Sequence, residues 1–443
     1  MKGKKSLLLI LVVVFSLILA SCQQAETPAE PETDAPVSEA PAEIVEIEFY
    51  FPEGFRRPEI YAKVIEAFEA KYPNIKVNVR LSTWSDFKPS LPLMWASDNV
   101  ADVVLTDAPD IHEYAYYGAL LPIDDLFPPE EYDLYAPGPV QAGLYKGNMY
   151  GAPYADSSIA FYYNVDMFEA AGIQPPTSVD DAWTFDKWLE NVKLVVEVAE
   201  EQQGRKVWGL TGTNNPPFGT YWTMWIPRTA GTLGSPTFMG VSEDGTVLSG
   251  YLDTPESLAA LQFYQDLFQV HELMPTANVP DAFPTGQSAC YMGVISDGWN
   301  WMDQYPDFNW GVMPLPYFET PLTHTGSFAP SISANAPHPE EAKIFLRFLT
   351  QEEGAMIYFT ESLSIPARLE FRDDIEALNL EYAQMFLELN ERFGVARPLT
   401  PGGAIYNEIV ATDMMLDIAL GADVASRVQQ AIQEAEALLA QFR

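Results

Sequence analysis

The residue types that perform catalysis or bind metal ions are spread along this sequence without the spacing that either chemistry needs. Its four histidines lie far apart and show no metal-ligand spacing, so no metal site is predicted. The sequence has no phosphate-binding G-x-x-x-x-G-K-[ST] loop, no G-x-S-x-G elbow and no H-E-x-x-H pair. Neighbouring carboxylates such as Asp124 and Asp125 are expected by chance among 62 acidic residues. The sequence therefore favours binding without a cofactor over catalysis, although glycosidase carboxylates have no universal spacing and an enzyme stays an alternative.

Hydrophobic patterns define the elements that must position any binding site. Strands are predicted for residues 45–51, 75–81 and 101–107, with helices for 57–74 and 84–98 between them. This β-α-β-α-β order predicts an α/β fold in which a parallel sheet carries helices on its faces. Later in the chain, helices are predicted for residues 338–359 and 404–443, the second with a break near Gly421.

Two residues follow the predicted strands at the edge where parallel sheets bind ligands. Trp84 comes after the second strand, and Asp107 ends the third. Because ligands of open α/β sheets bind beyond the carboxyl ends of the strands, both are candidates for a binding cleft. The alternatives are a packing role for Trp84 and a helix N-cap for Asp107.

The charge of the chain limits its partners. The sequence has 443 residues, enough for two or three domains, with 62 acidic residues against 24 basic ones and a formal net charge of −38. A surface this acidic repels phosphate groups, so nucleic acid and anionic lipid are poor partner candidates. A solvated acidic shell explains the charge without a specific cation site.

Residues 1–21 are predicted to be a lipoprotein signal peptide. Three lysines precede an apolar run over residues 7–20, which is shorter than the roughly 20 residues that span a bilayer. The following "LASC" resembles the bacterial lipobox, in which the cysteine, here Cys22, is acylated. Acylation anchors a protein to a membrane without spanning it. A cleaved secretory signal followed by an incidental cysteine is the alternative.

Residues 22–44 are predicted to form an acidic tether, because residues 23–43 contain four prolines and six carboxylates and no aromatic residue. The only other cysteine, Cys290, lies among small and apolar residues in "QSACYMGVI". We expect it to be a buried, inert thiol.

A long stretch in the middle of the chain resembles a known family. The segment "FYYNVDMFEAAGIQPPTSVDDAWTFDKWLENVKLV", residues 161–195, is similar to the maltose-binding-protein-like solute-binding proteins of ABC sugar importers. The segments "GNMYGAPY", "FPTGQSACYMGVISDGW" and "SIPAR" resemble further parts of that family in the same order. The likeness covers nearly all of residues 45–443, and the order of the segments carries it. Pro89, Pro92 and the "NNPP" of 214–217 depart from the family's pattern near the expected cleft.

The resemblance implies a two-lobed, type II periplasmic-binding-protein-like fold with mostly parallel sheets, flanking helices and a ligand cleft at the hinge. Lobe 1 would comprise residues 45–154 and 326–364, and lobe 2 residues 155–325 and 365–443. The hinge crossings are expected near 153–154, 325–326 and 364–365. In residues 161–163, the alternation of a strand puts Phe161 and Tyr163 on one face, which we expect to be buried.

The resemblance also implies a sugar site. Aromatic platforms stack on the apolar faces of sugar rings, and Asp, Asn or Arg side chains bind the hydroxyl groups. By this resemblance Trp299 sits on the cleft floor, and Gly326 supplies hinge backbone. The remaining candidate ligand contacts are Trp84, Asp107, Asp156, Ser157, Trp222, Arg368 and Tyr406. A core role is the alternative for each aromatic residue, and a lobe-to-lobe or helix-end salt bridge is the alternative for Arg368.

Together these features predict a monomeric, lipid-anchored, extracytoplasmic or periplasmic receptor. It would capture a carbohydrate, preferably an oligosaccharide, and deliver it to an ABC permease without catalysing a reaction. A receptor for peptides, polyamines or another solute is one alternative. A lipid-anchored carbohydrate-active enzyme is another.

Overall fold

The structure, a computed structural model, describes residues 44–54, 57–97, 99–212 and 223–443. The predicted signal peptide, the acylation of Cys22, most of the tether and Trp222 lie outside these ranges. Within them, no helix has the length and apolar character needed to cross a membrane. These described residues pack as one unit.

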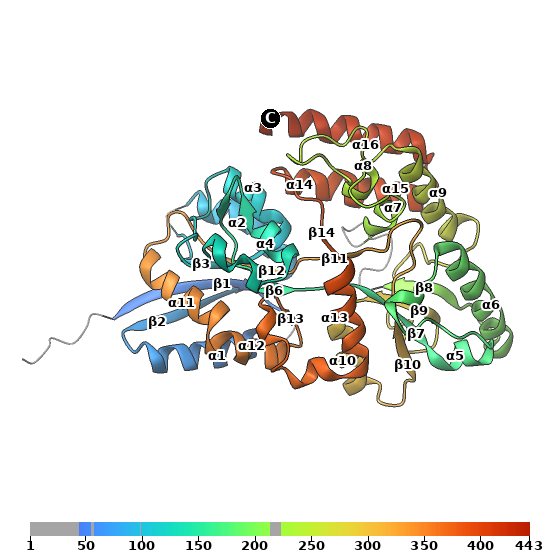
Figure 1. Cartoon of the computed structure of the whole chain (residues 1–443), viewed down its shortest axis with the longest axis horizontal. Helices are drawn as coiled ribbons and strands as arrows, with labels where there is room; N and C mark the ends of the chain where they lie inside the picture. Colours follow the sequence, from blue (N-terminus) through green and yellow to red (C-terminus); the bar gives the residue numbers. More distant parts are fainter. Residues whose placement is uncertain (1–43, 55–56, 98, 213–222) are drawn as a thin grey trace, which may run out of the picture. The chain divides into compact units, whose positions relative to one another are not determined.

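The first sheet is built from the predicted β-α-β-α-β segment and one strand from much later in the chain (Figure 1). Its strand order is β12-β3-β1-β2. The strands are β1 (Val45–Pro52), β2 (Ile75–Ser82), β3 (Val103–Asp107) and β12 (Phe328–Ile332). β1 pairs in parallel with β2 and β3, and β12 runs antiparallel to β3. The predicted order of elements is therefore confirmed.

Helices cover both faces of this sheet (Figure 1). On one face lie α1 (Arg57–Lys71), α11 (Pro339–Gln351) and α12 (Glu353–Ser362), packed around Phe49 and Phe345. On the other face lie α2 (Trp84–Trp95), α3 (Ile111–Tyr116) and α4 (Pro137–Gly143), around Tyr50 and Phe87. The single helix predicted for 338–359 is in fact two helices that meet at Glu352.

The second sheet has the order β10-β7-β9-β8. Its strands are β7 (Ala160–Asn164), β8 (Trp208–Gly212), β9 (Ser288–Gly293) and β10 (Trp310–Met313). Only β8 and β9 are parallel, whereas β7 runs antiparallel to both of its neighbours. The prediction of mostly parallel sheets thus holds for the first sheet and is wrong for this one, because the chain enters β7 directly from a hinge strand and not through a crossover helix.

The aromatic residues of β7 are enclosed on both faces of the strand. Phe161 packs against Trp188 in the core of the second sheet, and the half-buried Tyr163 shares that face, as predicted. Tyr162 points the other way and is also fully buried, with its ring 4.9 Å from the ring of Trp301. The prediction that one face of this strand is buried was therefore incomplete, because α10 (Ile295–Gln304) and α13 (Glu381–Phe393) cover its second face as well.

Four short strands lie where the chain passes between the two sheets. β6 (Ala155–Asp156) pairs with β13 (Ile365–Pro366), and β11 (Thr323–Thr325) pairs with β14 (Gly394–Ala396). Each expected hinge crossing is next to one of these strands, but the lobe boundaries themselves stay a prediction. The sequence reading did not anticipate β14.

The C-terminal helices pack on the core of the second sheet. They are α14 (Gly403–Ile405), a π-helix over Tyr406–Met414, α15 (Met415–Ala419) and α16 (Val424–Leu439). The predicted break occurs at Gly421, whose φ of +99° favours glycine. Other helices on this core are α5 (Val165–Ala170), α6 (Phe185–Gln203) and α9 (Pro255–Gln269). Cys290 is buried in β9 as expected, and burial raises the pKa of its thiol.

Replacement of Tyr162 by phenylalanine should lower the free energy of unfolding by about 1–3 kcal/mol, because the buried Gly298 amide loses the hydroxyl as a partner and the Val294 carbonyl oxygen loses one of its donors. The Tyr162 hydroxyl donates to the Val294 carbonyl oxygen at 2.8 Å and accepts from the Gly298 amide at 3.1 Å. Urea denaturation measures the difference. The matched variant Tyr163→Phe, at a half-buried ring, should change stability little. Equal losses in the two variants would contradict this role of Tyr162.

Candidate functional site

Side chains from four elements gather at the carboxyl edge of the first sheet. Trp84 begins α2, Asp107 ends β3, and Phe328 begins β12. The Arg57 guanidinium, at the start of α1, lies 4.2 Å from the centre of the Phe328 ring. The Trp84 ring, which is 43% exposed, meets the same ring edge-on at 5.7 Å. The parallel strand order thus brings Trp84 and Asp107 to one edge, where a half-exposed aromatic wall lies beside charged groups.

A buried ionic network adjoins this aromatic wall. Asp107 accepts from Lys88 Nζ at 2.8 Å and from Arg397 Nη2 at 2.6 Å. Lys88 also contacts the Asp110 carboxylate at 2.8 Å. Asp107 occupies the N-cap position of a 3₁₀ turn but makes no capping hydrogen bond with its side chain. The N-cap alternative for Asp107 is therefore wrong, since its carboxylate binds two cations instead.

The network shifts the pKa values of Asp107, Lys88 and Asp110. Burial alone would raise the pKa of the Asp107 carboxyl, but Arg397 and Lys88 outweigh burial and hold it below its usual range. Burial would likewise lower the pKa of Lys88, and the two carboxylates raise it above normal. For Asp110, burial and the nearby Asp107 charge raise the pKa despite the contact with Lys88. Asp107 is thus firmly ionised, whereas Asp110 is the carboxyl of the pair that protonates more readily.

The sequence reading missed Lys88, Asp110 and Arg397. Lys88 lies one helical turn after Trp84, and Asp110 lies one turn after Asp107, so their spacing placed both beside predicted site residues. Arg397 gave no such signal, because it lies 290 residues from its partner Asp107.

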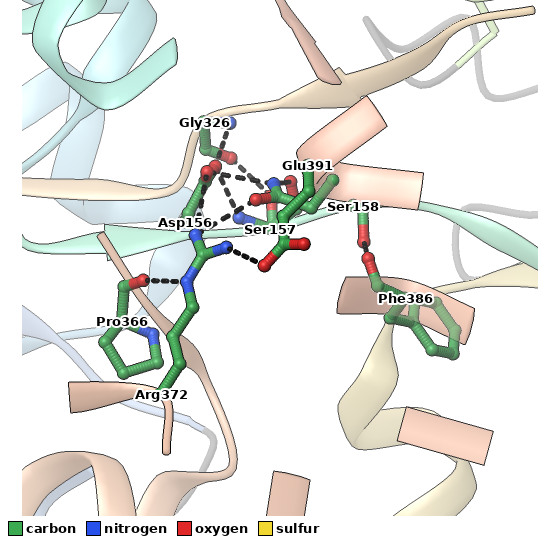
Figure 2. A network of polar contacts seen from close by, with 9 residues as sticks. Asp156, Ser157, Ser158, Gly326, Pro366, Arg372, Phe386 and Glu391 are labelled. Atoms are coloured by element: carbon green, nitrogen blue, oxygen red, sulfur yellow. Dashed lines mark hydrogen bonds and ion pairs between the residues drawn. The ribbon is translucent and has the colours of Figure 1, made fainter. Parts of the chain in front are cut away.

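A second polar network holds the hinge together (Figure 2). The buried Asp156 carboxylate accepts from the amides of Ser157 at 2.8 Å and Gly326 at 3.1 Å, and from Asn390 Nδ2 at 2.9 Å. Arg372 Nη2 lies 3.9 Å from the same carboxylate. The Ser157 hydroxyl donates to the Gly326 carbonyl oxygen at 2.5 Å. These bonds join β6, the turn after β11 and α13 in one unit.

The occupied acceptors of Asp156 favour a structural role at the hinge. Both of its oxygens already accept from N–H groups, and the side chain is 1% exposed. A ligand contact by Asp156 or Ser157 stays a prediction. Gly326 has a φ of +109°, a conformation that favours glycine, and its role as hinge backbone stays a prediction. A Cβ atom at Gly326 would lie 3.6 Å from Arg397 Nε, which places the hinge beside the ionic network.

The other predicted contacts lie apart from these two networks. Trp299 is in the first turns of α10 and is 40% exposed, whereas Tyr406 is 2% exposed in the C-terminal π-helix. Among the described residues, the Tyr406 hydroxyl has no hydrogen-bond partner. Arg368 pairs with Glu370 in the adjoining 3₁₀ turn at 2.5 Å, which matches the helix-end salt-bridge alternative.

The described part of the chain contains no group of three or more His, Cys, Asp or Glu side chains that could hold a metal ion. The arrangement at the sheet edge consists of an aromatic wall and fixed charges. Such a surface can stack on a ring and exchange hydrogen bonds with hydroxyl groups.

Comparison with known proteins identifies the family. The family model for the bacterial extracellular solute-binding proteins matches residues 56–356, more than half of the chain. The protein belongs to this family. This solute-binding protein is 28% identical over 192 residues to an uncharacterised ABC transporter extracellular-binding protein of Pyrococcus horikoshii. That match covers 43% of the chain and 44% of the relative, so it spans less than half of either protein.

Longer matches cover most of the chain. The solute-binding protein is 23% identical over 387 residues to an arabinooligosaccharide-binding protein of Bacillus subtilis, which covers 80% of the chain and 78% of the relative. An ABC substrate-binding protein of Listeria monocytogenes, solved in complex with cycloalternan, superposes with a TM-score of 0.72 at 20% identity. This superposition covers 90% of the chain and 99% of the Listeria protein and shows the fold alone. The predicted two-lobed type II binding-protein fold is confirmed.

Replacement of Asp107 by asparagine should lower the free energy of unfolding by about 3–5 kcal/mol, because the buried Arg397 loses its close carboxylate contact and the partly exposed Lys88 keeps only Asp110. The pKa of Asp107 is depressed, so its contribution is present above the unfolded-state pKa of about 4 and is lost as the pH falls towards the folded value. The difference between wild type and Asp107→Asn should therefore be largest near pH 7 and shrink below about pH 4. Urea denaturation across this pH range measures it.

The matched control for this variant is Asp180→Asn, which breaks the exposed pair with Arg392. It should change stability little, because exposed ion pairs are screened by water. A loss at Asp107 no larger than the loss at Asp180 would contradict the role of the buried network.

Proposed function

We propose that this solute-binding protein captures a carbohydrate, preferably an oligosaccharide, between its two lobes and delivers it to an ABC permease. The observation that carries the proposal is the edge of the first sheet, where the exposed face of Trp84 lies beside Phe328 and the network of Lys88, Asp107 and Asp110. Aromatic platforms next to fixed polar groups suit a sugar ring. The names of the arabinooligosaccharide-binding relative and the cycloalternan complex support the same ligand class.

Each part of the edge has a distinct task in this proposal. Trp84 offers a face for stacking, and Lys88 and Asp110 exchange hydrogen bonds with hydroxyl groups. Trp299 meets the ligand from the second lobe. Because Asp107 is held by two cations, it orients Lys88 and Arg397 and does not bind the sugar itself.

In this proposal, lobe 1 comprises residues 45–154 and 326–364. Lobe 2 comprises residues 155–325 and 365–443. Ligand bound between them stabilises the closed arrangement through its higher affinity for that state. The Asp156 network holds the strands about which the lobes move. We further propose that Cys22 carries a lipid anchor, that the protein acts as a monomer and that it catalyses no reaction.

A thermal-shift screen tests the ligand class. Maltotriose, mannobiose or an arabino-oligosaccharide should raise the Tm, since a ligand at 100 times its Kd adds about 2.7 kcal/mol of stability to the native state. Spermidine and short peptides, the other solute classes, should not. A Tm raised by spermidine or peptides and by no sugar would show that the carbohydrate assignment is wrong. Turnover of any of these sugars during incubation, followed by chromatography, would contradict the receptor assignment.

Replacement of Trp299 by alanine should weaken binding of the sugar found in that screen about tenfold or more, which corresponds to roughly 1.4 kcal/mol. Isothermal titration calorimetry gives the Kd, and urea denaturation gives the stability. The control Met302→Ala removes another exposed apolar side chain of α10, 46% exposed, and should leave the Kd unchanged. A large loss of stability in Trp299→Ala with an unchanged Kd would show that Trp299 is a packing residue.

A further inference from the structure

A cavity of about 400 Å³ lies on the first sheet's helical layer, between the C-terminal ends of α2 and α3. Three aromatic side chains, Trp95, Tyr114 and Tyr117, form its walls together with Glu113 and Asn335. Trp84, at the opposite end of α2, belongs to the sheet edge described above. Since a helix rises 1.5 Å per residue, the length of α2 puts the two places on the order of 16 Å apart.

The walls of this cavity are held in place by specific contacts. The Trp95 ring packs edge-on against Tyr114 at 4.7 Å, and its indole N–H donates to the Ser333 hydroxyl at 3.0 Å. Gly118, with a φ of +67°, turns the chain after α3, and the Ala119 amide then donates to the Tyr114 carbonyl oxygen at 2.9 Å. The cavity is therefore a formed feature of the fold.

The chemistry of the lining matches a sugar ring. Tyr117, which is 60% exposed, and Asn335, which is also exposed, both line the cavity. Glu113 accepts from the Ala404 amide through Oε2 at 2.7 Å, which leaves its other oxygen for a hydroxyl donor. Aromatic faces with one carboxylate and one amide are the groups that bind a neutral polyol. The volume lies in the range of small-molecule pockets.

We propose that this cavity is an accessory site for one neutral sugar ring, separate from the site between the lobes. The inference goes beyond the proposed function and rests on it only for the choice of sugars as probes.

Two of the cavity walls also contact the C-terminal segment, which packs on the other sheet. Glu113 binds the Ala404 amide, and the Tyr117 ring lies 6.1 Å from the Phe442 ring. Next to Tyr117, the Tyr116 hydroxyl donates to the Gln441 carbonyl oxygen at 3.0 Å. A ring bound in the cavity therefore touches residues that link α3 to the C-terminus.

Ligand-observed NMR titrations of the full chain with D-glucose, D-mannose, D-tagatose and, as a cationic probe, choline test the proposal. At least one monosaccharide should bind, with a Kd that Tyr117→Ala and Asn335→Ala each weaken about three- to tenfold. Both side chains are exposed, so neither variant removes core packing. Leu93→Ala is the matched control, because it removes a 74% exposed side chain of α2 that does not line the cavity. Phe442→Ala removes the C-terminal ring and leaves the cavity lining intact. Both controls should keep the Kd within about twofold.

The outcomes separate this proposal from the function proposed above. Monosaccharide binding that Trp299→Ala weakens and the two cavity variants leave unchanged contradicts the accessory site and leaves the receptor function standing. Binding of choline alone, lost in Tyr117→Ala, overturns the assignment to a neutral sugar. Monosaccharide binding that depends on Tyr117 and Asn335, with no Tm shift by any oligosaccharide, supports the accessory site and contradicts the receptor function. No binding of any sugar contradicts both.

Discussion

The ion pair between Asp107 and Arg397 fixes the geometry on which the candidate site depends. Arg397 extends from the end of β14, beside the hinge, to the carboxyl edge of the first sheet, and its Nη2 lies 2.6 Å from Asp107 Oδ1. The two side chains are 5% and 7% exposed. Burial of two charges carries a large desolvation cost, which is offset only when the pair is close and its other atoms are also bonded. Lys88 binds the second oxygen of the Asp107 carboxylate, and Asp110 binds Lys88 in turn. As a result, β3, α2 and β14 have to keep their relative positions.

The cost of burying a charged group without partners also constrains the hinge. Asp156 is buried, and three N–H groups from three segments satisfy its carboxylate. Burial raises its pKa, although Asn390, Arg372 and the amides of Gly326 and Ser157 act in the opposite direction. Because a buried acceptor without partners is costly, the strands that pass between the sheets stay together around this group. The two networks meet at Gly326, whose amide donates to Asp156 and where an added Cβ atom would lie 3.6 Å from Arg397 Nε.

Local patterns in the sequence were sufficient to predict the three parallel strands of the first sheet, but not β12. Alternation over 45–51 and 75–81 and the helical face of 57–74 depend on burial of one face, which is a local property. Trp84 and Asp107 could be placed at one edge because parallel strands end at the same edge. The direction of β7, the burial of Tyr162 and the pairing of Arg397 with Asp107 depend on residues 100 or more positions away. No periodicity within a segment carries that information.

The central claim is that Asp107 and Arg397 act as one unit that joins the hinge to the sheet edge. A double-mutant cycle of Asp107→Asn and Arg397→Gln, measured as free energies of unfolding in urea, tests it most directly. The account predicts a coupling energy of about 1.5 kcal/mol or more, in the range found for close charge pairs. Additivity of the two single variants within about 0.5 kcal/mol would contradict it.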